Sequence, residues 1–354
     1  MDKNNKTDHS LMNFIINVVN GATVGILVAV IPNAIFSQIF LSLSGFWSGF
    51  KQLYLIVQII QFLMPVLVGI GVGFKFKLTA IQLLSVGVAS YVGSGALVQT
   101  SDIWKVTGIG DTINAMLTAG IAVFLVLLIQ NKVQALATIA YPVIVGMGAG
   151  AVGLVTLPLI SKITSFVGKI VYDATKLNPL LMSILIAILF ALMILTPISV
   201  VAVAFAINLT GLGSGAANLG LVGVVVFATI GSYRAKNDTG TTLALMLGGI
   251  KTLMPAFFRK LQMALPIIFV SGIMGAMAQL FNIQGTPGSA GLGFAGLVGP
   301  IVAFGYLKNS FIVNLIILIL VYAIIPIILS LLAHWLSVSV FKILKYSDYK
   351  INLN

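Results

Sequence analysis

Long apolar runs separated by short polar stretches repeat along the whole chain. The runs at 53–74 and 112–130 contain no charged residue. Each exceeds the roughly 18 residues that cross a hydrocarbon core of about 30 Å as a helix. The strict alternation of membrane β-strands is missing, and unbroken apolar runs are typical of membrane helices. The pattern predicts an all-α polytopic membrane protein with about eight to ten transmembrane helices.

The composition supports this prediction. Charged residues make up 7% of the 354 residues, whereas a soluble domain carries roughly 25%, because water must wet its surface. The formal charge of +12 comes from basic residues spread over many loops. That spread favours the positive-inside rule over nucleic-acid binding. We expect a multi-pass protein of the bacterial cytoplasmic (inner) membrane, embedded in the lipid bilayer with both termini cytoplasmic.

Three stretches of the chain differ in pattern. Residues 1–160 hold apolar spans without dense polar clusters, and we expect an amino-terminal transmembrane scaffold there. Residues 161–177 place apolar side chains on one face and lysines elsewhere, which predicts an amphipathic surface helix. Residues 178–354 form the third part, which becomes rich in glycine after residue 210.

Two glycine-rich segments interrupt the membrane-like sequence of the third part. NLTGLGSGAANLGLVG begins at residue 208, and NIQGTPGSAGLGFAGLVGPIVAF covers 282–304. Such interruptions free backbone groups that only protein or a water-filled cavity can satisfy, and paired ones mark transporter binding sites. We predict re-entrant hairpins near 208–231 and 282–305. The alternative is close helix packing, which glycine and serine also permit.

Neutral hydrogen-bonding side chains gather in these segments and suit a hydroxyl-rich solute. In the loop RAKNDTGTT, Asp238 is expected near a cytoplasmic mouth, where its carboxylate accepts hydrogen bonds from the solute; the alternative is a loop acid paired with Arg234. The candidate substrate-binding residues are Asn208, Ser214, Asn218, Asn237, Asp238, Thr239, Thr286 and Ser289.

The residue types present in the chain limit the kinds of catalytic and metal sites that it can form. The chain lacks cysteine and glutamate and has two histidines, His9 and His334. Disulfides, thiolate metal sites and a Ser–His–acid arrangement cannot be assembled from this set. We therefore expect no metal, no cofactor and no catalytic residue.

Four stretches of the second half carry a family resemblance: PISVVAVAFAINLTGLGSGAANLG, SYRAKNDTGTT, MLGGIKTLMP and NIQGTPGSAGLGFAGLVGP. They resemble the EIIC-like membrane components of the bacterial sugar phosphotransferase system, with a glucose-superfamily-like fold and nearest the subgroup called phosphotransferase EIIC or PfoR-type. The resemblance implies a sugar permease that works as a homodimer. Residues 1–160 would form the dimerisation domain, and residues 178–354 the substrate-binding domain that moves against it. Separate EIIA and EIIB phosphocarrier proteins are the implied partners.

One departure from the family leaves the function open. Sugar permeases of that superfamily hold substrate with a hairpin glutamate and a histidine, whereas this chain has no glutamate and no midchain histidine. The first hypothesis is an EIIC-like permease that moves a small polar solute, a sugar or other polyol, by alternating access. The alternatives are an EIIC-fold membrane sensor or regulator without phosphorylation-coupled transport, and an ion-coupled secondary transporter that uses Asp238.

Overall fold

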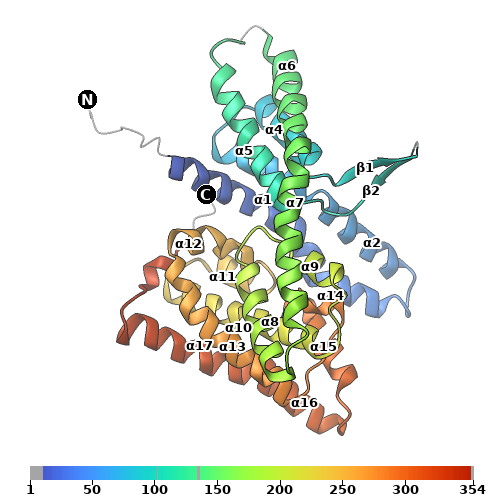
Figure 1. Cartoon of the computed structure of the whole chain (residues 1–354), viewed down its shortest axis with the longest axis vertical. Coiled ribbons are helices and arrows are strands. Elements are labelled where there is room, and N and C mark those ends of the chain that lie inside the picture. The colour runs from blue at the N-terminus through green and yellow to red at the C-terminus, as the bar shows by residue number, and fades with distance from the viewer. Residues whose placement is uncertain (1–10, 102, 134–135, 352–354) are drawn as a thin grey trace. The chain divides into compact units, whose positions relative to one another are not determined.

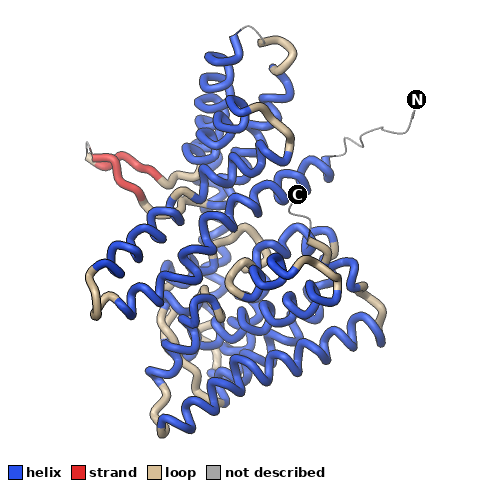
Figure 2. Tube along the Cα trace, turned by 180° about the vertical axis from the view of Figure 1, so that it is seen from behind, coloured by secondary structure: helices blue, strands red, loops and turns tan. Residues whose placement is uncertain are grey.

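The chain folds into two compact units in a computed structural model that describes residues 11–101, 103–133 and 136–351. The first unit comprises Met1–Val28 and Phe62–Pro158, and the second comprises Ala29–Gln61 and Leu159–Asn354. Figures 1 and 2 show that both units are helical and that one short β-ribbon is present. The prediction of an all-α polytopic membrane protein is confirmed.

Close helix contacts hold the first unit together. A Cβ atom on Gly25 would lie 2.1 Å from the Leu67 carbonyl oxygen, so a glycine is needed where these helices cross. The buried Asn114 amide donates to the Gly93 and Gly153 carbonyls and thereby joins three helices. The elements that lie in this unit or enter it are α1 (Leu11–Leu43), α3 (Met64–Lys75), α4 (Ala80–Gly93), β1 (Leu97–Thr100), β2 (Ile103–Val106), α5 (Thr112–Ile129), α6 (Ala137–Ala140), η2 (Tyr141–Ala149) and α7 (Gly150–Ala174).

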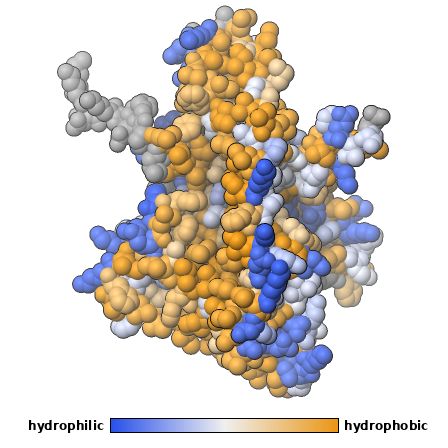
Figure 3. Space-filling view, in the orientation of Figure 1, coloured by the Kyte–Doolittle hydropathy of each residue, from blue (hydrophilic) through white to orange (hydrophobic). Residues whose placement is uncertain are grey.

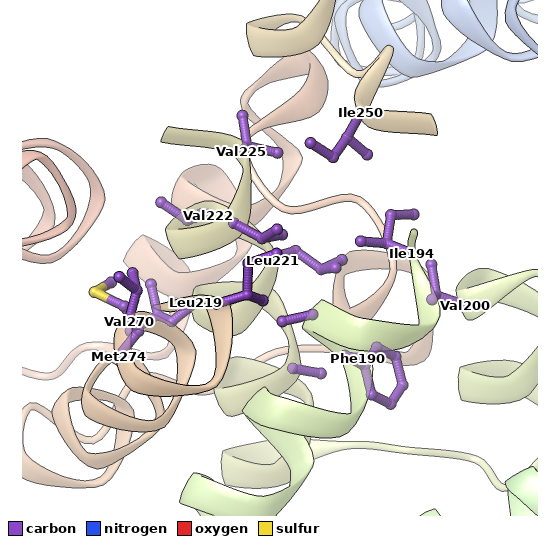
Figure 4. Close-up of a cluster of buried hydrophobic side chains, with 14 of the residues drawn as sticks. Phe190, Ile194, Val200, Leu219, Leu221, Val222, Val225, Ile250, Val270 and Met274 are labelled. Carbon is purple, nitrogen blue, oxygen red and sulfur yellow. The ribbon is translucent and has the colours of Figure 1, made fainter. Parts of the chain in front are cut away.

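Helix α10 (Gly211–Arg234) forms the centre of the second unit. Every residue from 213 to 225 is buried, because α8 (Pro179–Met193) and α13 (Ala264–Leu280) pack against it. Figure 4 shows Phe190, Leu219 and Val270 among the apolar side chains buried along these three helices. A helix that is apolar all round must be enclosed in this way.

Shorter elements make up the rest of the second unit. They are α2 (Gly49–Phe62), α9 (Val200–Ala206), α11 (Thr239–Met246), η3 (Ile250–Leu253), α12 (Met254–Arg259), η4 (Leu261–Met263), α14 (Pro287–Ala290), η5 (Ala295–Leu297), α15 (Val298–Tyr306), α16 (Phe311–Ile319), η6 (Leu320–Ile324), α17 (Ile325–His334), η7 (Trp335–Val340) and η8 (Tyr346–Tyr349).

Several helices have the length and composition of membrane spans. Among the described residues, six helices are long and apolar enough to cross a bilayer, and two bent helix pairs raise the number to eight. The pairs are α2–α3, bent by 50°, and α11 with Ile250–Arg259, bent by 120°. Apolar side chains also cover large parts of the face in Figure 3, as a lipid environment requires. Eight spans is the lower end of the predicted range.

The predicted hairpin near 208–231 is wrong, because α10 is one continuous helix over Gly211–Arg234. Its glycines serve close packing. A Cβ atom on Gly215 would lie 1.8 Å from the Ile283 carbonyl oxygen, and one on Gly220 would lie 2.3 Å from the Ala187 carbonyl oxygen. Backbone contacts of this kind stabilise a glycine-rich helix that would be poor in isolation.

A helical hairpin does occur immediately before α10. Ser183, near the start of α8, lies against Gly275 near the end of α13. Gly211, where α10 starts, pairs with Gly285 just beyond α13. Since the rest of α8 rises about 15 Å beyond Ser183, the chain must turn and come back. The turn is at residues 194–199, and α9 is the returning arm.

The second glycine-rich segment is broken, unlike the first. Between 287 and 306 it contains two short α-helices and a 3-10 turn. Gly293, Gly296 and Leu297 have positive φ angles of 58°, 57° and 57°. Repeated breaks are what a re-entrant segment requires.

The amphipathic stretch 161–177 is not a separate helix. Residues 161–174 continue α7, which starts at Gly150 and tolerates Pro158 inside it. The division between the two compact units falls after Pro158, and residues 29–61 group with the later part of the chain. The functional roles expected of 1–160 and 178–354 stay predictions.

Candidate functional site

A short break joins α9 to α10. The Leu209 N–H donates to the Ala204 carbonyl over 2.9 Å, which closes the end of α9. Asn208 has a φ of 50°, a left-handed conformation that asparagine tolerates better than most residues. Gly211, with a φ of 60°, then opens α10. One helix therefore ends and the next begins within a few residues.

The end of α13 repeats the helix end and the left-handed asparagine of this break. The Ile283 N–H donates to the Ala278 carbonyl over 2.8 Å. Asn282 also has a φ of 50°, and Gly285 follows at the matching position. The sequences Asn-Leu-Thr-Gly and Asn-Ile-Gln-Gly thus form equivalent helix ends. Sequence similarity between them is confined to the asparagine, the apolar residue and the glycine.

The two breaks meet through their glycines. The Gly211 N–H donates to the Gly285 carbonyl over 2.9 Å, and the Gly285 N–H donates to the Gly211 carbonyl over 3.0 Å. We call residues 208–211 and 282–285 the paired junction. Interrupted helices that meet in this manner expose backbone and polar groups inside an apolar protein, which is the geometry of many transporter sites.

Buried polar side chains next to the paired junction form hydrogen bonds between the two glycine-rich segments. The Ser214 hydroxyl donates to the Thr286 carbonyl over 2.6 Å. The Asn218 amide donates to the Ser289 and Gly293 carbonyls, while its oxygen accepts from Tyr322 over 2.9 Å. Ser214, Asn218 and Ser289 were predicted to contact solute. Each is at most 2% exposed, and the hydrogen-bonding groups of Asn218 are all engaged, so these side chains hold the two segments together.

Other polar side chains of the junction face outward. Asn208, Thr210 and Asn282 are exposed, and Gln284 is half-buried. The Gln284 amide donates to the Asn282 side-chain oxygen over 3.0 Å, which leaves further donors and acceptors open. Thr286 is half-buried, and its hydroxyl accepts from the Ser289 N–H at the start of α14. Of the predicted contacts, Asn208 and Thr286 are the accessible ones here.

The remaining predicted contacts lie at the opposite end of α10. That helix has 24 residues, which corresponds to roughly 35 Å. Asn237 donates to the Ser232 hydroxyl and to the Tyr349 carbonyl. Asp238 accepts from the Thr241 N–H over 2.8 Å and from its hydroxyl, and these bonds lower the pKa of the carboxyl. Thr239 is exposed beside it.

Asp238 is therefore an amino-terminal cap of α11. Within the described chain its carboxylate bonds to Thr241 rather than to Arg234, so the predicted pairing with Arg234 is not formed. The structure does not bring Asn237, Asp238 and Thr239 together with the paired junction.

The C-terminal residues 345–351 bind to this same end of α10, a contact that no sequence pattern indicated. The Ile351 N–H donates to the Asn237 side-chain oxygen, and the Lys350 ammonium donates to the Lys236 carbonyl. The fully buried Tyr349 ring packs against Gly231 and Phe227, and burial raises the pKa of its hydroxyl. His334 stacks on Phe227 with ring centroids 4.2 Å apart.

An apolar pocket of about 450 Å³ lies elsewhere in the second unit. Ser337 supplies its one hydroxyl, which already donates to the Ala333 carbonyl. Such walls suit a hydrocarbon chain and offer a polar solute almost no hydrogen bonds. The lining residues are Leu265, Pro266, Phe269, Ala333, Leu336, Ser337, Phe341 and Ile343, and none belongs to the paired junction.

Comparison with known proteins gives one match. Residues 16–351 match the family described as phosphotransferase system, EIIC. No curated protein and no solved structure matches the chain.

Proposed function

Because this chain belongs to the EIIC family of the phosphotransferase system, a family of sugar-transport membrane components, we propose that it is a permease for a small neutral polar solute. The solute is a sugar or other polyol, and transport proceeds by alternating access. The observation that carries the proposal is the paired junction. Two equivalent helix breaks present amide and hydroxyl groups without a charged side chain among residues 208–211 and 282–285.

The chemistry of the junction favours hydroxyl groups as ligands. An amide offers both donors and an acceptor, and a sugar hydroxyl can satisfy both kinds of group. Asn208 and Asn282 stand at matching positions on either side of the glycine pair, with Thr210 and Gln284 beside them. Thr286 completes the set of accessible groups. Ser214, Asn218 and Ser289 support these residues from the buried side.

The basic end of α10 supports a cytoplasmic location for the C-terminus. Arg234, Lys236, Arg259 and Lys350 lie there, and the Arg259 guanidinium donates to the Lys350 carbonyl. Basic residues are retained on the cytoplasmic side. The paired junction then opens toward the other side of the inner membrane, since α10 is long enough to span it. The amino terminus, also proposed to be cytoplasmic, lies outside the described residues.

We further propose a homodimer formed through the amino-terminal half, with phosphocarrier proteins EIIA and EIIB as partners. Both features come from the family resemblance. The division of the chain into two compact units supports a carrier in which one unit moves against the other.

The alternative function is a membrane sensor or regulator that binds solute without phosphorylation-coupled transport, and the absence of glutamate from the chain favours it. Ion coupling through Asp238 is disfavoured, because its carboxylate caps α11.

A thermal-unfolding screen of the full chain in lipid nanodiscs tests the proposal. Neutral sugars and polyols are compared with organic acids and nucleosides at equal ionic strength. A ligand present at about 100 times its Kd stabilises the folded state by about 2.7 kcal/mol. We expect stabilisation by at least one sugar or polyol and by no organic acid. Stabilisation by organic acids alone would contradict a neutral site.

A further inference from the structure

Lys251 is a charged residue in the middle of the bent segment formed by α11, η3 and α12. It lies on η3, between α11 and α12, and its neighbours Ile250, Thr252 and Leu253 are buried. Its ammonium donates to the Thr196 carbonyl over 2.5 Å and to the Ile198 carbonyl over 3.0 Å. Both carbonyls belong to the turn at 194–199, where the hairpin of α8 and α9 reverses. Lys251 therefore binds the tip of this hairpin.

The helix break explains why these carbonyl groups are available. α8 ends at Met193, and Pro197 has no N–H to continue its ladder of hydrogen bonds. The Ala202 N–H, which would pair with the Ile198 carbonyl in a continuous helix, donates to the Ser199 hydroxyl instead. The Thr196 hydroxyl donates to the Met193 carbonyl and accepts from the Ile198 N–H, and Ser199 caps α9. Within the turn, the Thr196 and Ile198 carbonyls face the ammonium. The end of α8 also carries the negative end of the helix dipole, which favours a cation.

No carboxylate neutralises Lys251 in the described part of the chain. α8, the turn and α9 contain no titratable side chain. On the elements packed against η3, the charged groups are Arg234 at the end of α10, Asp238 at the start of α11 and Arg259 at the end of α12, and none bonds to Lys251. Carbonyl oxygens of an interrupted helix are the ligands that transporters offer to a coupling cation.

We propose that the Thr196 and Ile198 carbonyls form a monovalent-cation site at the hairpin tip and that the Lys251 ammonium is its built-in occupant. The protonated Lys251 amine thus takes the place that a bound metal ion has in other cation sites, and its charge holds the hairpin tip. When Lys251 gives its proton to water, the neutral amine keeps its lone pair, the site loses its charge and the tip is released. The inference goes beyond the proposed function, because it assigns a cation site and requires no particular solute.

The absence of cysteine from the chain permits a direct test. Ile198→Cys, at a half-buried position of the tip, serves as a single reporter in the full chain in nanodiscs. The rate of maleimide labelling measures opening of the tip, and Gln99→Cys on the exposed β1 strand corrects for reagent chemistry. Rates are measured with choline, Na⁺ or K⁺ as the chloride salt.

The variants separate charge from packing. With Lys251 in place, the Ile198→Cys reporter should react slowly with maleimide and at the same rate in all three salts. Lys251→Met fills the space without charge, and Lys251→Gln keeps donors without charge; both should label about tenfold faster in every salt. Lys251→Ala empties the site, so labelling should be fast in choline and slowed severalfold by K⁺ or Na⁺. Labelling of Lys251→Met at the Lys251 rate, or no effect of either metal ion on Lys251→Ala, would overturn the proposal.

A pH series keeps the test informative if Lys251→Ala fails to fold. Arginine does not lose its proton in the accessible range. The labelling rate of Ile198→Cys is divided by that of Gln99→Cys at each pH. This ratio should rise at alkaline pH when Lys251 is present and should stay constant in Lys251→Arg. The same pH dependence in both backgrounds would contradict proton binding at Lys251.

Discussion

The two glycine-rich segments have similar compositions and opposite structures. Residues 211–234 form one buried helix, whereas residues 287–306 break repeatedly. Particular glycines serve different purposes in the two segments. Gly215 and Gly220 lie against the backbones of neighbouring helices, while Gly293 and Gly296 adopt positive φ angles. Glycine content therefore indicates close backbone approach, and the neighbouring elements decide between a packed helix and a turn.

The largest effect is expected when one methyl group is added to a glycine of the packed helix, because this tests whether close backbone contact requires glycine there. In Gly215→Ala the new Cβ would lie 1.8 Å from the Ile283 carbonyl oxygen, and backbone cannot move aside as a side chain can. We expect a loss of more than about 4 kcal/mol in unfolding free energy, or failure to fold. Gly305→Ala is the matched control, since nothing lies within 4 Å of its added Cβ. Reversible unfolding in mixed micelles measures both, and equal stability of the two variants would refute the packing role.

The next largest effect concerns the link between the two segments. Asn218→Ala leaves the Gly293 carbonyl and the Tyr322 hydroxyl without these partners in a buried place, and the Ser289 carbonyl keeps the Leu292 N–H. Each unsatisfied buried group costs about 1–3 kcal/mol, so we expect a total loss of about 3 kcal/mol or more. Asn208→Gly, at an exposed position that retains its backbone conformation, should change stability by less than about 0.5 kcal/mol. Similar losses for both would show that the buried and exposed layers were assigned wrongly.

The smallest predicted effect lies at the far end of α10. Thr241 lowers the pKa of Asp238 below its ordinary value of 3.8. The stability that this carboxylate contributes is therefore fully present above that value and is lost as the pH falls through the lowered pKa. Thr241→Val should reduce the loss of stability between about pH 5 and pH 2, and Thr241→Ser should preserve it. The effect is small, because water screens an exposed carboxylate. Identical acid-unfolding curves for Thr241→Val and Thr241→Ser would contradict this role.

The sequence predicted the membrane class because hydrophobic length and charge depletion depend on local composition alone. It also brought Ser214, Asn218, Thr286 and Ser289 into one region, which the hydrogen bonds of the structure confirm as neighbours. The burial of Ser214, Asn218 and Ser289 was not predictable, because it depends on contacts between segments more than seventy residues apart. The hairpin predicted near 208–231 was wrong, because the glycines there pack against neighbouring backbones, and the chain instead turns at Pro197 before that segment.

Two other features left no local signal. The binding of residues 345–351 to Asn237 joins parts of the chain that are separated by more than a hundred residues. Lys251 lies within MLGGIKTLMP, one of the four stretches that carry the family resemblance. Its contact with the hairpin tip arises only when the bent segment packs against the turn at 194–199. Tertiary contacts of this kind are outside the reach of periodicity and composition.

Equilibrium binding of the best sugar or polyol from the screen tests the location of the site most directly. The double variant Asn208→Gly, Asn282→Gly removes both asparagine amides of the junction while glycine keeps the left-handed backbone. Losing two neutral hydrogen bonds should weaken binding about tenfold or more, whereas Thr239→Ala at the far end of α10 should leave the Kd unchanged. Unchanged binding by the double variant together with weakened binding by Thr239→Ala would place the solute at the opposite end of the helix and contradict the account.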